Sequence, residues 1–163
     1  MKLLMMALAL LVVLAGSVAA QTPDQQPSAV APPEPGATAA VYEAVARYQI
    51  KSWQQTAHTY CFRVQGKDAD RQFLDKLKPL PVKPESDCTQ KDSKSFTMSI
   101  VDKSSKKSAV MFGLGGILWR SPTQAEVEGS YLCGSQCMAG GVYHVVQDGG
   151  AWTVTGFDVR ISQ

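Results

Sequence analysis

The sequence predicts an α+β fold in which an N-terminal helix packs on a curved antiparallel sheet. Three observations support this: helical periodicity from Thr38 to about Trp53, a period of two in the apolar residues beyond residue 94, and a change of parity at Thr155-Gly156. The 163 residues, 45% of them hydrophobic, suffice for one domain. A net charge of +2 is too small to indicate a nucleic-acid-binding protein.

The first 37 residues are predicted to lie outside the folded domain. Residues 1–20 have the parts of a secretory signal peptide: Lys2, an apolar run from Leu3 to Ala15, and small residues before a cleavage point at Ala20. That run is shorter than the ~20 apolar residues that span a bilayer. Residues 21–37 hold five of the nine prolines and no aromatic residue, which predicts a disordered linker. We therefore expect an exported chain, periplasmic or secreted, with a single domain at 38–163 and no membrane span after cleavage.

Two helices are expected in the first half of the domain. Thr38 is a candidate N-cap, and Glu43 and Arg47 are spaced to pair on the polar side of the first helix. A second, shorter helix is predicted over 69–77, ending before Pro79. The apolar stripe of the first helix comprises Val41, Ala44, Val45 and Tyr48.

The second half of the domain alternates apolar and polar residues as strands do. Asp148-Gly149-Gly150 is typical of a hairpin turn, and the parity change at Thr155-Gly156 predicts a β-bulge that bends the last strand. Gly113-Leu114-Gly115-Gly116 lacks the further residues of a nucleotide-binding loop and is interpreted as a tight turn between strands. The expected strands lie at about 96–100, 108–112, 126–131, 141–147 and 152–161.

The four cysteines are expected to form two disulfides, because an exported chain folds in an oxidising compartment. Three pairings are possible, and the most economical joins Cys61 to Cys88 and Cys133 to Cys137. An alternative is a copper-binding or thiol-redox protein that uses Cys133, Cys137, Met138 and His144, which are ligand types that copper prefers.

His144 is the main candidate for acid–base chemistry. It shares a predicted strand face with Val142 and Val146, so it can point into a concavity of the sheet. A second alternative is therefore a small cone-fold enzyme with His144 as the base and Asp158 or Glu128 as its orienting carboxylate. Neither a catalytic-triad spacing nor a His-Glu-x-x-His motif is present, so a non-catalytic protein is favoured.

The C-terminal third carries a weak resemblance to known proteins. Its Gly129-Ser130-Tyr131-Leu132-Cys133-Gly134 segment leads to Cys137, and Gly150-Ala151-Trp152-Thr153-Val154 follows the hairpin turn. This pattern is similar to that of small secreted bacterial proteins of unknown function and, more distantly, resembles the last hairpin of cystatin-like and nuclear-transport-factor-like cone folds. The resemblance implies a cone-like sheet, and such folds host isomerases, dehydratases and binding modules.

The leading hypothesis is a disulfide-stabilised, non-catalytic binding domain, exported and most simply periplasmic in a Gram-negative bacterium. We expect it to bind a small ligand or an envelope protein through the concave face of the sheet, without a cofactor or nucleic acid. The candidate binding residues are Tyr131, Tyr143, His144 and Trp152.

Overall fold

The computed structural model describes residues 34–53, 57–92 and 98–162. The predicted signal peptide, most of the predicted linker and the start of the strand expected at 96–100 lie outside these residues. The helices are α1 (Ala37–Trp53) and α2 (Arg71–Lys76), with a 3₁₀ turn at Glu85–Asp87, and the strands are β1 (Thr59–Val64), β2 (Lys67–Asp68), β3 (Val82–Pro84), β4 (Cys88–Asp92), β5 (Met98–Asp102), β6 (Ala109–Ser121), β7 (Gln124–Gly134), β8 (Cys137–Asp148) and β9 (Ala151–Ser162).

The four longest strands form an antiparallel meander in the order β6-β7-β8-β9, which confirms the predicted antiparallel sheet. β1 extends this sheet at β6, and it runs parallel to both β6 and β3. β1 was not predicted from the sequence. At the C-terminal end of β7, Gly134 pairs with Ser99 of β5, and β5 pairs in turn with β4, antiparallel in both cases.

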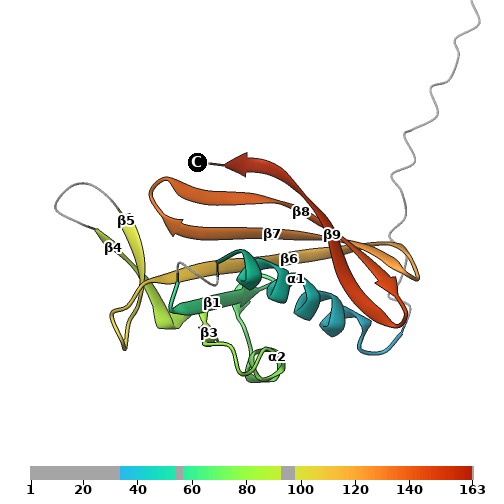
Figure 1. Ribbon diagram of the computed structural model, residues 1–163, viewed down its shortest axis with the longest axis horizontal. Coiled ribbons are helices and arrows are strands. Elements are labelled where there is room, and N and C mark those ends of the chain that lie inside the picture. Colours follow the sequence, from blue (N-terminus) through green and yellow to red (C-terminus); the bar gives the residue numbers. More distant parts are fainter. Residues whose placement is uncertain (1–33, 54–56, 93–97, 163) are drawn as a thin grey trace, which may run out of the picture.

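The helix α1 lies on the concave side of the meander (Figure 1). It contacts β6, β7, β8 and β9. The strands of the meander curve around this helix (Figure 1). The predicted architecture, a helix on a curved sheet, is thereby confirmed. The buried side chains of α1 are Ala37, Val41, Tyr42, Val45, Ala46, Gln49 and Ile50.

The predicted details of α1 are confirmed in part. Val41 and Val45 are fully buried, but Tyr48 lies at the margin of the apolar stripe and is 41% exposed. The Glu43–Arg47 pair forms, with 2.9 Å between Oε1 and Nε. Thr38 is not the N-cap, because the helix already begins at Ala37. For α2, the side chain of Asp70 accepts a hydrogen bond from the backbone N–H of Phe73 and caps the helix.

Two bulges bend β9. The first confirms the predicted parity change: Val154 pairs with Val145 and Gly156 with His144, so Thr155 is the extra residue. A second bulge, not predicted, occurs at Arg160, between the pairs Gly140–Ile161 and Gly141–Val159. The hairpin turn before β9 also forms as expected, with positive φ at both Gly149 and Gly150.

The turn predicted at 113–116 is wrong. β6 continues through these glycines, with only a register irregularity between Leu114 and Ile117. The absence of a side chain here serves close packing instead, because a Cβ on Gly113 would lie 2.7 Å from the hydroxyl oxygen of Ser130 on β7.

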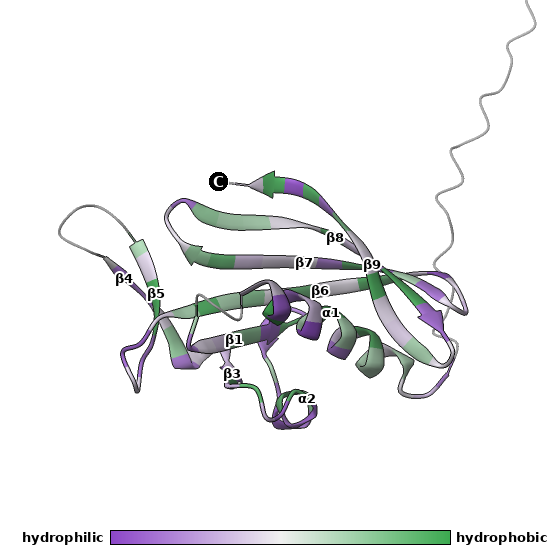
Figure 2. Ribbon diagram, in the orientation of Figure 1, coloured by the Kyte–Doolittle hydropathy of each residue, from purple (hydrophilic) through white to green (hydrophobic). Residues whose placement is uncertain are grey.

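Hydrophobic residues form two clusters on opposite faces of the sheet. The large cluster lies between α1 and the inner face and includes Phe62, Phe112 and Ile50. The small one contains Cys61, Cys88, Ile100 and Ala109, with Met111 and Leu132 packed against it. Figure 2 shows the hydrophobic run along β6, which contributes to both.

Both disulfides have the pairing that was predicted as most economical. Cys61–Cys88 joins β1 to β4 with 6.2 Å between the Cα atoms, and Cys133–Cys137 closes the turn between β7 and β8 with 5.3 Å. The described residues contain no free cysteine.

Candidate ligand-binding groove

The sequence-predicted site residues lie on two different faces of the sheet. Along β8, successive side chains alternate between the faces, so Tyr143 points toward α1 and His144 points away from it. Tyr131 and Trp152 also pack against the large cluster on the α1 side. The three aromatic residues therefore do not form a common surface with His144.

Tyr143 is a core residue. It is 2% exposed, stacks on Phe157 with ring centroids 4.2 Å apart, and occupies the space left by the missing side chain of Gly129. Gln49 of α1 donates a hydrogen bond from Nε2 to its hydroxyl at 3.2 Å. Burial raises the pKa of Tyr143 to about 12, so the phenol is protonated at neutral pH.

Tyr131 and Trp152 pack in the same way. The ring of Tyr131 lies 5.1 Å from that of Trp53, and the ring of Trp152 lies 5.6 Å from that of Trp119, both between centroids. These contacts lie between the helix and the concave face, so α1 occupies the space that the sequence analysis assigned to a ligand.

His144 lies on the outer face between two carboxylates. Its Nε2 is 2.7 Å from Oδ2 of Asp158, and its Nδ1 is 3.9 Å from Oε1 of Glu126. Of the two carboxylates considered as orienting groups, Asp158 is the one that contacts His144. Glu128 lies on β7 in register with Val142 of β8 and forms no contact of this kind with His144. A base needs one ring nitrogen directed at a substrate, and here each nitrogen faces a carboxylate.

The four residues of the copper hypothesis are not gathered in one place. Cys133 and Cys137 are joined in a disulfide. Met138 and His144 are six positions apart on β8, which is about 20 Å in a strand. Among the described residues no group of three or more His, Cys, Asp or Glu side chains is placed to hold a metal ion.

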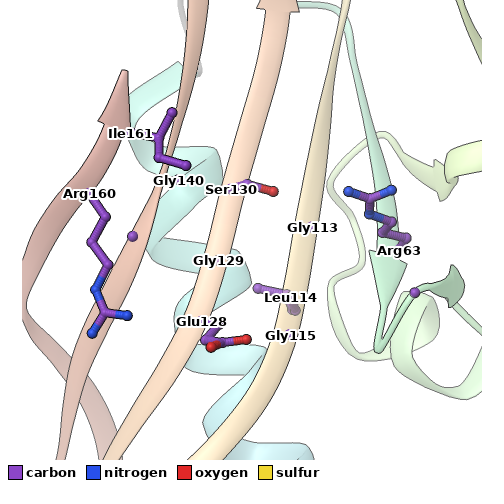
Figure 3. Close-up of a pocket in the computed structure, with 12 residues that line it drawn as sticks. Arg63, Gly113, Leu114, Gly115, Glu128, Gly129, Ser130, Gly140, Arg160 and Ile161 are labelled. Carbon is purple, nitrogen blue, oxygen red and sulfur yellow. The ribbon is translucent and has the colours of Figure 1, made fainter. Parts of the chain in front are cut away.

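A groove of about 390 Å³ lies on the outer face, on the side of the sheet away from α1 (Figure 3). Its floor is one row of residues that are paired in register across five strands, β1-β6-β7-β8-β9. The floor is low because three of the five residues are glycine or serine. In order along the row they are Arg63, Gly113, Ser130, Gly140 and Ile161.

The bulge in β9 builds one wall of this groove. Because Arg160 is the extra residue, it and Ile161 both line the groove instead of pointing to opposite faces. Gly141 permits the close approach of β9, since a Cβ there would lie 2.0 Å from the carbonyl oxygen of Asp158. Glycines in β6 and β8 therefore shape both the floor and the wall.

Three charged side chains line the groove, and two of them form no ion pair or hydrogen bond within the described residues. Arg63 Nη1 lies 3.8 Å from Oε1 of Glu85, a long and half-exposed ion pair. Arg160 and Glu128 form no ion pair or hydrogen bond with any described residue, although the charge of Arg160 helps to lower the pKa of the nearby Glu126. Among the described residues the hydroxyl of Ser130 forms no hydrogen bond either. Figure 3 shows Arg160 and Arg63 on opposite sides of the groove, with Ser130 and Glu128 on the strand between them.

Comparison with known proteins identifies no relative: no family model, curated protein or solved structure matches the chain. No helix in the described part of the chain is long and apolar enough to cross a membrane.

None of the groove residues was predicted as a binding residue from the sequence, and Glu128 was considered only as an orienting carboxylate. The glycines of 113–116 and 140–141 were visible, but their meaning depends on register. Only the pairing of five strands places Gly113, Ser130 and Gly140 side by side.

Proposed function

We propose that this chain is an exported, disulfide-stabilised binding domain that captures a ligand with an anionic group in the outer groove. The leading hypothesis from the sequence, a non-catalytic binding domain, is kept, but its binding surface moves from the concave face to the opposite face. The observation that carries the proposal is the guanidinium of Arg160, which a bulge places at the wall of a groove and which forms no ion pair or hydrogen bond with a described residue.

The physical argument concerns charge and access. A guanidinium has five N–H donors and binds carboxylate, sulfate or phosphate groups well. Arg160 donates no hydrogen bond to a carboxylate of the described residues, so its donors are available to a ligand. Arg63 adds a second positive charge from the opposite side. Beneath α1, the aromatic packing of Tyr131, Tyr143 and Trp152 fills the space that was predicted to hold a ligand. The opening of about 530 Å³ on this side lies between α1 and α2, away from these three residues. The two disulfides support export, since such bonds persist in oxidising compartments.

The test is an NMR titration of the exported protein with sodium acetate and with sodium sulfate at constant ionic strength. Saturating amide shifts are expected at Gly113, Ser130 and Gly140. The variant Arg160→Gln should weaken acetate binding about fivefold to tenfold, as for a lost charge-assisted hydrogen bond.

The matched control is Arg71→Gln, which removes the same charge from an exposed arginine on α2. It should leave the titration unchanged. Equal weakening in both variants would show a non-specific effect of net charge, and an absence of saturating shifts at the groove would refute the proposal.

A further inference from the structure

The groove also holds a negatively charged side chain, Glu128, that forms no ion pair or hydrogen bond with a described residue. The carboxylate of Glu128 lies over the bare backbone of Gly115, where a Cβ would be 3.0 Å from Oε2. Arg160 and Glu128 together line the groove and also the adjoining cavity of about 300 Å³. Nevertheless, the two side chains do not pair with each other.

A purely anionic ligand leaves this carboxylate unexplained. An acidic side chain beside the arginine lowers the local positive potential and weakens the binding of a simple anion. A ligand with both an ammonium and a carboxylate gains from both groups, because each of its charges meets an opposite one. The hydroxyl of Ser130, on the same strand as Glu128, can donate or accept one further hydrogen bond.

We propose that the groove binds a zwitterion, a short peptide with free ends, whose carboxylate meets Arg160 and whose ammonium meets Glu128. This inference rests on the proposed function, because it assigns the ligand class of the same groove.

The spacing of the strands sets the size of the ligand. Glu128 is on β7 and Arg160 on β9, so their backbones are two strand spacings apart, which is about 10 Å. An extended peptide spans ~3.3–3.6 Å per residue, so two or three residues separate its terminal charges by a matching distance. A free amino acid has the same two charges at a shorter separation, and a titration with peptides of increasing length distinguishes the two ligands.

The experiment is a calorimetric titration of the exported protein with alanine peptides of one to four residues at constant ionic strength. Two blocked probes accompany the series: N-acetyl-dialanine, which lacks the ammonium, and dialanine amide, which lacks the carboxylate. Dialanine or trialanine should bind about tenfold more tightly than either blocked probe, since each lost charge-assisted contact costs roughly 1.5 kcal/mol or more.

Two variants assign the charges. Glu128→Gln should abolish the preference for dialanine over N-acetyl-dialanine, and Arg160→Gln should abolish the preference over dialanine amide. Both residues are exposed, so thermal unfolding should be unchanged in both variants. Lys91→Gln, at an exposed site on β4, is the control.

The outcomes separate the two proposals. If N-acetyl-dialanine binds as tightly as dialanine and Glu128→Gln changes neither affinity, the proposal of a zwitterionic ligand is wrong. The proposed function, binding of an anionic group in the groove, is then still supported. Tightest binding of alanine itself would overturn the peptide in favour of a free amino acid. If acetate, sulfate and all of the peptides fail to bind at the groove, both proposals are wrong.

Discussion

The two faces of the meander differ in their side chains and in what covers them. On the inner face, the side chains of β6–β9 are apolar or aromatic and are covered by α1. On the outer face, the alternate residues of the same strands include Ser130, Gly140 and His144, and neither helix of the described residues covers them. At one end only, β4 and β5 cover the outer face over the small cluster that contains the Cys61–Cys88 disulfide. The inner face therefore provides stability, and the exposed part of the outer face remains available for binding.

The largest difference between the faces should appear when a side chain is truncated under α1. Ile50 is fully buried, so Ile50→Ala should lower the free energy of unfolding by about 2–5 kcal/mol in urea titrations. Lys51→Ala, at an exposed position of the same helix, should change it by less than about 0.5 kcal/mol. Equal losses in the two variants would mean that α1 does not hold the inner face.

The covered end of the outer face should depend on its covalent link. Cys61 and Cys88 are 27 residues apart, and replacing both by serine should cost about 3 kcal/mol, because the unfolded chain regains the entropy of that loop. Hydrogen exchange should then show earlier opening in β4 and β5 than in α1 and β8. The Cys133→Ser, Cys137→Ser pair is the comparison: its loop of four residues should contribute about 1.7 kcal/mol less. Uniform loss of protection across the sheet would contradict this prediction.

A matched pair of glycine substitutions compares the faces at one site. A Cβ on Gly129 would lie 2.5 Å from the packed ring of Tyr143, so Gly129→Ala should destabilise the fold by about 1–3 kcal/mol. A Cβ on Gly140 meets nothing closer than 3.8 Å, so Gly140→Ala should unfold at nearly the wild-type temperature. It should nevertheless weaken acetate binding, because its methyl group enters the groove floor. Unchanged acetate binding in Gly140→Ala would show that the groove floor at Gly140 is not part of the binding site.

The same comparison shows what could be predicted from the sequence. Local patterns were sufficient for α1, for the hairpin at Gly149-Gly150 and for the bulge at Thr155, because each depends on residues that are adjacent along the chain. Thr59–Val64 is too short and too apolar for its alternation to distinguish a strand from a buried loop, and β1 was missed.

The groove could not be predicted because it is a property of pairing. Whether Gly113 forms a turn or a floor depends on Ser130 lying opposite, 17 positions later in the chain. Likewise, the aromatic residues Tyr131 and Trp152 were correctly seen as prominent, but sequence periodicity does not say which face a helix will cover. The sequence pattern shows no sign of the bulge at Arg160, because Val159 and Ile161 alternate regularly and only the pairing with β8 reveals the extra residue.

The smallest effect is expected from the charges of the outer face on stability. Arg120 Nη2 donates to Oε2 of Glu126 at 2.8 Å, and this hydrogen bond lowers the pKa of Glu126 below its usual value. Because the pKa is lower in the folded state, the pair stabilises the protein above about pH 4.3, and this contribution is lost as the pH falls through the folded-state pKa. Arg120→Gln should therefore reduce stability slightly at pH 7 and leave it unchanged near pH 2, because solvent screens this pair. NMR titration of the Glu126 carboxyl should show its pKa rising toward the ordinary value in the variant. A loss comparable to that in Ile50→Ala would show that outer-face charges hold the fold, and would contradict the division of roles between the two faces.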